Sequence, residues 1–248
     1  MGVRVLVKNS MKTSAAIFLC ACSFLRTVAG EELLRQGWDA LLPGTEVRGL
    51  TEKKAGGSSS KEARIYVGNA VSVSGPNSLC YDFRDIAPKE RHGYSAVDLP
   101  PVGARESELQ FCFLHRQGRT IGEIRGFYRR PGQGNYGVNT PWSFLNIVLD
   151  GVLSVNLDGR PKSAALCVGD VRQGVWHRLT IRIPAPDAPN AVGLALLERR
   201  ISDGSFVKAG EIEVPFGELQ LKEVKFFDLY GHGPCRCEFD DFVWSARP

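Results

Sequence analysis

The stretch 176-WHRLTIRIP-184 alternates between polar and apolar residues with a period of two. Successive side chains on a β-strand point to opposite faces, so this spacing predicts a strand with one face on a hydrophobic core. The expected core face carries His177, Leu179, Ile181 and Ile183, and the expected outer face carries Trp176, Arg178, Thr180 and Arg182.

Similar short β-rich runs recur on both sides of this stretch, separated by Gly, Pro, Asn and Asp. Asp150-Gly151 and Asp158-Gly159 lie between such runs and are typical of hairpin turns. This pattern predicts an all-β fold, a two-sheet antiparallel β-sandwich or jelly roll, with one short N-terminal helix around Leu33–Leu41. The expected strands are 64–73, 78–83, 107–115, 121–128, 144–150, 152–158, 164–170, 176–184, 191–198, 206–214, 221–230 and 236–244.

Residues 1–30 are expected to be a signal peptide. Basic residues precede the apolar run 14-SAAIFLCACSFL-25, which is too short to span a bilayer, and small residues follow it. This predicts a secreted or periplasmic protein, with a lipoprotein anchored near Cys20 or Cys22 as the less favoured alternative. The remaining chain divides into an N-terminal segment with a Gly/Ser-rich loop (31–63) and a β-sandwich domain (64–248) on which that segment is expected to pack.

The positive charge of the chain resides in this leader. The whole sequence has 31 Lys and Arg against 27 Asp and Glu, and the leader holds four basic and no acidic residues. The balanced remainder gives no electrostatic reason to expect a nucleic acid or an anionic membrane as partner. No later apolar segment is long enough to span a membrane.

Five cysteines follow the leader: Cys80, Cys112, Cys167, Cys235 and Cys237. Export permits disulfides, but an odd number leaves at least one thiol unpaired within the chain. Cys235 and Cys237 would lie side by side on one strand face, which is a poor geometry for bonding each other. Either of them bridged to an earlier strand, and all five reduced and buried, remain equal alternatives.

Three stretches carry a resemblance to a known family: 75-GPNSLCYDF-83, 174-GVWHRLTIRIP-184 and 238-EFDDFVW-244. Together they resemble the concanavalin A-like lectin and glucanase superfamily, in particular its laminin G-like and carbohydrate-binding jelly rolls in secreted bacterial proteins. The resemblance implies a two-sheet sandwich, a structural calcium ion and a glycan-binding role. It does not imply catalysis, because this fold hosts binding modules and enzymes alike.

The sequence carries weaker motifs for catalysis than for glycan binding. The Glu-x-Asp-x-x-Glu strand of glycosidases with this fold does not occur, and the pairs Glu211/Glu213 and Glu106/Glu108 are more typical of solvated strand faces. A polysaccharide lyase needs a neutralising Arg or Asn and a Tyr or His base, for which His115, Arg125 and Tyr128 are the candidates. On one strand Arg125 and Tyr128 would face opposite ways, which counts against this trio.

The segment between Phe127 and Phe144 is the candidate ligand-binding region. It places aromatic, amide and basic side chains among glycines and prolines, as sugar sites do. The alternative is that its aromatic residues only pin the loop to the sandwich. The ligand-binding candidates are Tyr128, Arg130, Asn135, Tyr136 and Trp142.

Asp241 is the candidate metal ligand. On a regular strand it would lie on the apolar face with Cys235, Cys237 and Phe239, where a carboxylate needs a partner. Calcium bound with Asp82 or Asp85 would provide one, and a buried salt bridge or a bulge that turns Asp241 outward are the alternatives. A zinc site of His232, Cys235, Cys237 and Asp240 lacks a regular ligand spacing.

The sequence therefore predicts an exported, non-catalytic β-sandwich that binds a glycan or polysaccharide, with calcium as its only expected cofactor. A polysaccharide lyase or glycoside hydrolase of the same fold is one alternative. A structural or adhesive domain of the cell envelope is the other.

Overall fold

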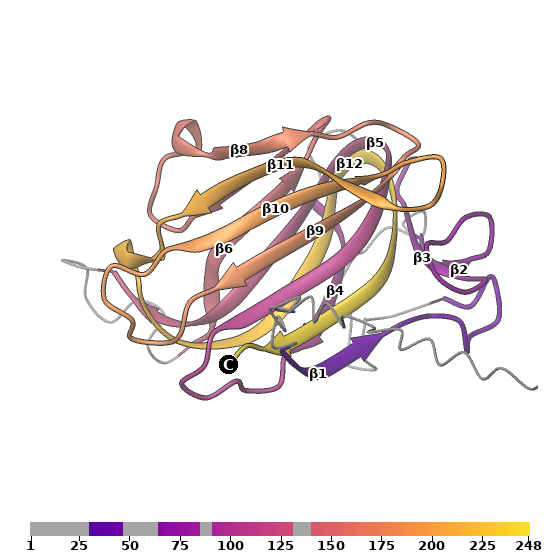
Figure 1. The fold of residues 1–248 in the computed structure, drawn as a ribbon. Helices are drawn as coiled ribbons and strands as arrows, with labels where there is room; N and C mark the ends of the chain where they lie inside the picture. The colour runs from indigo at the N-terminus through magenta and orange to yellow at the C-terminus, as the bar shows by residue number, and fades with distance from the viewer. Residues whose placement is uncertain (1–29, 47–63, 85–90, 131–139) are drawn as a thin grey trace, which may run out of the picture.

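The computed structural model describes residues 30–46, 64–84, 91–130 and 140–248 (Figure 1). These residues form strands and two short 3-10 turns, η1 (Lys162–Ala164) and η2 (Phe216–Glu218), and no α-helix. The strands are β1 (Glu31–Gln36), β2 (Arg64–Gly68), β3 (Ser78–Asp82), β4 (Arg91–Asp98), β5 (Ser107–Arg129), β6 (Trp142–Leu149), β7 (Val152–Leu157), β8 (Leu166–Asp170), β9 (Trp176–Ile183), β10 (Gly193–Arg200), β11 (Phe206–Val214) and β12 (Gln220–Ala246).

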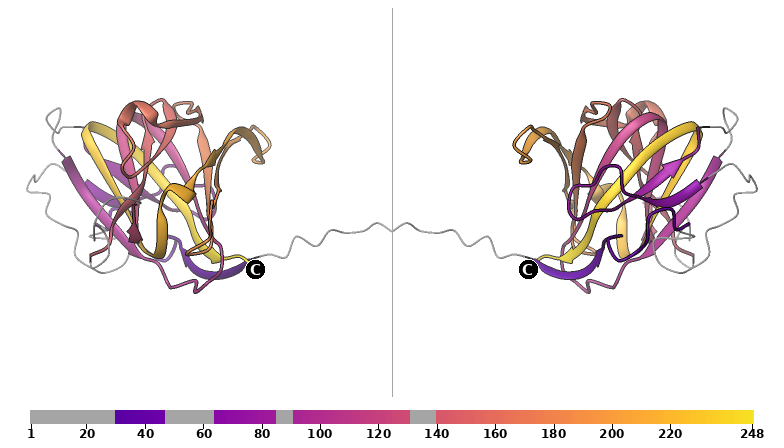
Figure 2. Two further views of the ribbon diagram at one scale, coloured as in Figure 1. Left: turned by 90° about the vertical axis from the view of Figure 1, so that its left-hand side faces the viewer. Right: turned by 90° about the vertical axis from the view of Figure 1, so that its right-hand side faces the viewer.

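Two long antiparallel strands, β5 and β12, pair with each other and pass together from one sheet into the other. The start of β5 and the end of β12 belong to a first sheet, in the order β11-β10-β9-β5-β12-β3-β2, with β1 also paired to β12. The end of β5 and the start of β12 belong to a second sheet, in the order β8-β7-β6-β5-β12-β4. Figure 1 shows β9, β10 and β11 side by side, and Figure 2 follows the yellow β12 as it arches through the molecule.

The two sheets enclose one hydrophobic core. Phe111 of the first sheet and Phe227 of the second pack with ring centroids 5.3 Å apart, and Phe227 also stacks on Phe242. The β9 face predicted to be apolar is buried here, because His177, Leu179, Ile181 and Ile183 all lie in the interior. Burial of aromatic and branched side chains from both sheets is the main favourable term in folding.

The predicted all-β sandwich and the β6–β7 hairpin are confirmed; in the hairpin Gly151 has φ 67°. The helix expected around Leu33–Leu41 is wrong. Residues 31–36 form β1 instead, because they add an edge to β12, with Leu34 opposite Trp244. The runs 107–115 and 121–128, expected as separate strands, are parts of β5, and the two C-terminal runs are parts of β12.

A β-bulge interrupts β12 after Asp240. Asp241 has φ 48°, and the register with β5 shifts between Asp240 and Val243. The extra residue changes the alternation, so that Phe242 and Trp244 point into the core in place of Asp241 and Val243. The regular strand assumed from the sequence is therefore wrong here, and the alternative of a bulge that turns Asp241 outward is what the structure shows.

None of the described residues belongs to a helix that is long and apolar enough to cross a membrane.

Candidate functional site

A row of polar side chains crosses the outer face of the second sheet. Asn156 on β7 lies opposite Asn146 on β6, Asn146 lies opposite Glu123 on β5, and Glu123 lies opposite Asp228 on β12. Their neighbours along each strand, such as Ile124 and Phe227, point into the core. Strand pairing therefore brings four residues from four distant parts of the sequence into one line.

Arg125 joins the two carboxylates of this row. Its Nη2 atom lies 2.7 Å from Glu123 Oε2, and its Nε atom lies 2.6 Å from Asp228 Oδ2. Tyr230, on the same face of β12, donates its hydroxyl to Glu123 Oε1 at 2.7 Å. Glu123 thus bridges a guanidinium and a phenol, and both its oxygen atoms are engaged.

These groups are buried although they lie on an outer face. Glu123 and Tyr230 are each 5% exposed, and Asp228 is 0% exposed. Removing a carboxylate from water costs several kcal/mol unless partners replace the lost hydration. An ionic network of this kind holds its members in fixed geometry, which is the property that a binding or catalytic site requires.

The two asparagines extend the network toward β7 with less complete bonding. Asn156 Oδ1 is buried and has no hydrogen-bond partner in the described part of the chain, while its Nδ2 reaches the Arg160 carbonyl at 3.5 Å. Among the described residues, Asn146 Oδ1 accepts a long bond of 3.5 Å from Ser143 Oγ. Side-chain amides in this state can exchange these contacts for the hydroxyl groups of a ligand.

The chemistry available here is acid–base chemistry beside a fixed positive charge. Glu123 and Asp228 bond the same Arg125 nitrogen, so their nearest oxygen atoms are less than about 6 Å apart, a spacing at which paired carboxyl groups can work together. Tyr230 adds a hydroxyl that can donate or accept a proton. Arg125 would stabilise negative charge that develops close to it.

The structure separates the three predicted lyase residues. Arg125 lies in the polar row, but Tyr128 is fully buried between the sheets, where its hydroxyl donates to Asp158 Oδ2 and also lies 3.1 Å from the Ser143 carbonyl oxygen. His115 lies in the interior at the bend of β5, and its Nε2 atom contacts the Gly118 carbonyl at 2.7 Å. The expected opposition of Arg125 and Tyr128 across β5 is confirmed.

The predicted ligand-binding residues also separate. Tyr128 is part of the core, and Arg130 forms an ion pair with Asp158. Trp142 is 46% exposed at the start of β6, opposite Gly126 of β5, at one end of the second sheet. Asn135 and Tyr136 lie outside the described residues.

The predicted calcium ligands do not meet. Asp82 forms two 2.7 Å bonds with Arg84. It lies opposite Arg236 of β12. Arg236 is five residues before Asp241, which is roughly 16 Å along a strand. Asp241 bonds the Ser74 hydroxyl, and Asp85 lies outside the described residues. The described residues include no cluster of three or more His, Cys, Asp and Glu suited to a metal.

The structure also separates the residues of the candidate zinc site and forms no disulfide among the described cysteines. Cys235 and Cys237 are buried side by side on the core face of β12, as expected, whereas Asp240 lies on its outer face. No disulfide joins any of the cysteines that the structure describes, and Cys167 alone among them is exposed. Of the glutamate pairs, Glu211 forms an ion pair with Lys208 on the edge strand β11.

Sequence reasoning missed Asn146, Asn156, Asp228 and Tyr230. The alternation was visible, because Phe226, Asp228 and Tyr230 occupy every second position between apolar residues, as Glu123 and Arg125 do. The sequence does not show that β12 pairs with β5, and this pairing places the two polar runs side by side.

Solved structures provide the comparison with known proteins. A mutant alginate lyase in complex with an alginate trisaccharide aligns with 89% of this chain and 100% of its own, at 12% identity and a TM-score of 0.53. The glucuronan lyase of the fungus Trichoderma reesei aligns with 86% of this chain and 95% of its own, at 14% identity and a TM-score of 0.50. The lumenal domain of VIP36, in a form bound to Ca2+ and Man3GlcNAc, covers 74% of this chain and 83% of its own at 9% identity and a TM-score of 0.45.

No protein-family model matches the sequence, and no curated protein matches it significantly. At these low identities the structural likeness shows the fold alone. The chain has the jelly-roll β-sandwich fold of these polysaccharide lyases.

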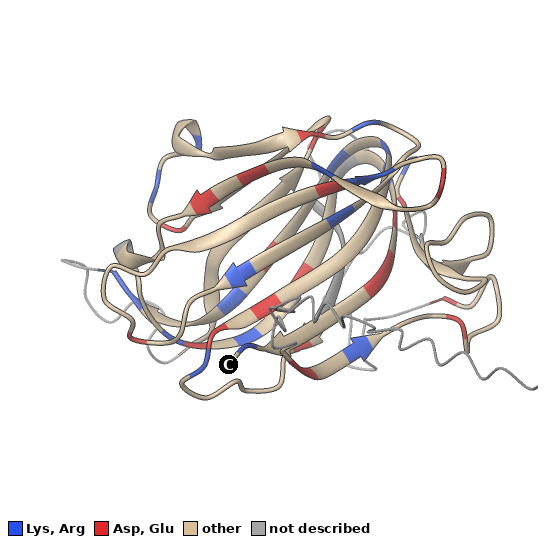
Figure 3. Cartoon of the chain, in the orientation of Figure 1, with Lys and Arg blue, Asp and Glu red and all other residues tan. Residues whose placement is uncertain are grey.

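Charged residues of both signs lie along the strands of the first sheet (Figure 3). Figure 3 shows acidic and basic residues interspersed over the strands that face the viewer. The polar row of the second sheet is distinguished by its burial and hydrogen bonding.

Proposed function

We propose that this protein binds a polysaccharide across the outer face of the second sheet, along the row from Asn156 to Asp228. The observation that carries the proposal is the buried network of Glu123, Arg125, Asp228 and Tyr230, on a face where packing alone requires no charge. Amides and carboxylates in a line across four strands match a chain of hydroxyl-bearing rings.

A binding assay with paired variants tests this proposal. The protein is titrated with oligosaccharides of alginate, glucuronan and neutral glucans, and we expect saturable binding to at least one of them. Asn146→Ala combined with Asn156→Ala should weaken that binding roughly tenfold, since each lost hydrogen bond contributes about 0.5–1.5 kcal/mol.

The matched control is Glu213→Gln, which changes an exposed residue on the first sheet and should leave affinity unchanged. Equal affinity of the wild type and the double asparagine variant would show that the ligand binds elsewhere. No binding to any member of the panel would remove the proposal.

The bond between Tyr230 and Glu123 favours a second candidate, a polysaccharide lyase. In β-elimination a base removes the proton beside a uronate carboxylate, the glycosidic oxygen leaves, and a nearby acid protonates it. Tyr230 is the group we expect to move the proton, with Arg125 and the two asparagines beside the carboxylate. The similar structures include a glucuronan lyase and an alginate lyase, which supports assaying these substrates first.

Tyr230→Phe separates the two candidates because it deletes only the hydroxyl. For a lyase, kcat for the unsaturated product should fall at least about 100-fold with KM little changed. Binding without any product would exclude the lyase and leave the binding proposal in place. New reducing ends without unsaturation would instead assign hydrolysis to the carboxyl pair Glu123 and Asp228.

A further inference from the structure

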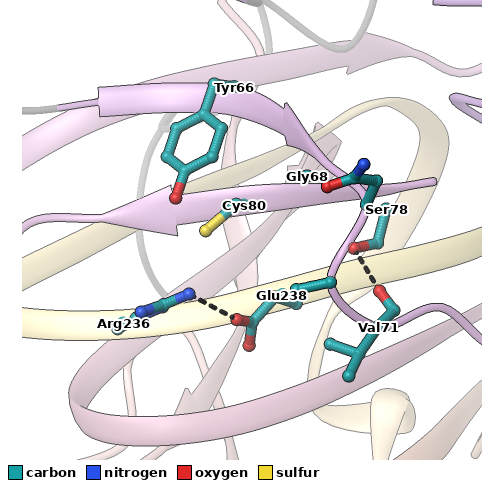
Figure 4. A pocket seen from close by; sticks show the side chains of 9 residues that line it. Tyr66, Gly68, Val71, Ser78, Cys80, Arg236 and Glu238 are labelled. Carbon is teal, nitrogen blue, oxygen red and sulfur yellow. Dashed lines mark hydrogen bonds and ion pairs between the residues drawn. The ribbon is translucent and has the colours of Figure 1, made fainter. Parts of the chain in front are cut away.

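The outer face of the first sheet carries a pocket of about 160 Å³ between β2, β3 and β12 (Figure 4). Its polar wall is formed by Tyr66, Ser78, Arg236 and Glu238, and Val71 and Cys80 contribute apolar surface. Because Cys237 and Phe239 point into the core, Glu238 points away from it. The pocket therefore lies across the sandwich from the polar row of the second sheet.

Hydrogen bonds hold the rim of the pocket in place. Its rim is the connection between β2 and β3, and two backbone groups of that connection, Val73 N and Ser74 N, donate to Asp240 Oδ2 at 2.8 and 3.2 Å. Ser78 Oγ donates to the Val71 carbonyl at 2.8 Å and fixes the same rim from within (Figure 4). A wall held in this way loses little entropy when a ligand enters.

An ion-paired cluster forms the floor of the pocket. The Glu238 side chain is 4% exposed and contacts two guanidinium groups. Its Oε1 atom lies 3.3 Å from Arg236 Nη2, and its Oε2 atom lies 3.2 Å from Arg116 Nε. Both contacts are longer than usual for charge-assisted hydrogen bonds. Arg236 Nε is buried and finds no acceptor among the described residues.

Tyr66 and Cys80 on the pocket wall keep their protons and can donate hydrogen bonds. Burial raises the pKa of Tyr66 to about 12, so its hydroxyl keeps its proton at neutral pH. Burial also raises the pKa of the Cys80 thiol, which therefore stays protonated and is a poor nucleophile. These directions argue against a redox or covalent role and for recognition of an acceptor.

We infer that this pocket binds a carboxylate group, held by Arg236 with Tyr66 as a second donor. A volume of about 160 Å³ admits a small ligand or the end of a larger one, since a cavity of about 150 Å³ accommodates a benzene ring. The carboxylate could belong to a free small acid or to a terminal uronic acid residue. The site is independent of the polysaccharide proposal for the second sheet.

Three probes distinguish these sources: acetate, glucuronate and glucose, titrated separately into the full chain and followed by amide chemical shifts or calorimetry. Saturable binding of glucuronate without acetate identifies a uronic acid site, and binding of both identifies a general carboxylate site. Glucose has the same ring as glucuronate without the charge, and it should bind at least tenfold more weakly. Equal binding of glucose and glucuronate, or no saturable binding of either acid, would overturn the inference.

Arg236→Gln should weaken carboxylate binding at least tenfold, whereas Arg84→Gln, whose ion pair with Asp82 lies outside the pocket lining, should leave it unchanged. If Arg236→Gln fails to fold, Tyr66→Phe provides the second test, because it removes one donor and keeps the ring. Unchanged affinity in the folded variant that is tested would contradict the assignment. Asn156→Ala should have no effect here, which keeps this test separate from that of the polysaccharide row.

Discussion

At the scale of single residues, several carboxylates on the outer faces of the sheets are buried. Glu123, Asp228, Glu238 and Asp240 are all nearly inaccessible to water. Each has a compensating partner: arginines for the first three and backbone N–H groups for Asp240. Sequence alternation predicts which face such a residue occupies, but not whether a neighbouring strand or loop supplies the partner.

His177 provides a pH-dependent prediction. Its ring lies in the core, stacked on Phe113, with Nδ1 2.9 Å from the Val175 carbonyl and Nε2 accepting from Arg172 N at 3.3 Å. Burial lowers the pKa of His177 to about 4 from its ordinary value of 6.5. The unfolded chain therefore binds more protons than the folded one between these two pH values, and protonation favours unfolding as pH falls.

The measurement compares denaturant unfolding of wild type and His177→Phe from pH 7 to pH 4. The stability of the wild type relative to the variant should fall over this range by on the order of 2–3 kcal/mol. Asp240 acts in the opposite direction, because burial raises its pKa to about 6, but it contributes equally to both proteins. A difference between the two proteins that does not change with pH would contradict the neutral, buried histidine.

At the scale of elements, the passage of β5 and β12 from one sheet to the other depends on Gly118. This residue has φ 72°, and a Cβ atom built there would lie 2.0 Å from the Pro234 carbonyl oxygen. Gly118→Ala should therefore destabilise the protein by roughly 2–4 kcal/mol, from the left-handed conformation and the backbone clash together.

Gly103→Ala is the matched control, because Gly103 has φ 68° but open space around its Cβ position. Its cost should be about 1 kcal/mol, from conformation alone. Equal losses of unfolding free energy in the two variants would mean that the close approach of β5 to the β12 backbone does not constrain this bend.

The same bend shows what the sequence could and could not predict about elements. The alternation in β9 and the Asp150-Gly151 turn are local signals, and they correctly predicted a strand and a hairpin. The continuity of β5 through Gly118 depends on pairing with β12, more than a hundred residues later in the chain. The bulge at Asp241 and the edge strand β1 likewise follow from tertiary pairing, which local propensity does not encode.

At the scale of the whole molecule, one jelly-roll sandwich presents two unlike outer faces. The second sheet carries the row from Asn156 to Asp228, and the first sheet carries the pocket around Arg236. The sequence alone predicted the jelly-roll sandwich correctly, and its glycan binding stays a prediction. The position of the row could not be predicted, because it is assembled from four strands that meet only in the folded sheet.

Hydrogen exchange of backbone amides, with and without a bound oligosaccharide of alginate or glucuronan, tests the proposed binding face most directly. A ligand on the second sheet should slow exchange in segments 119–129, 142–157 and 220–230 and leave β9, β10 and β11 unchanged. Slowed exchange confined to 176–214, with no change in the second sheet, would contradict binding along the row from Asn156 to Asp228.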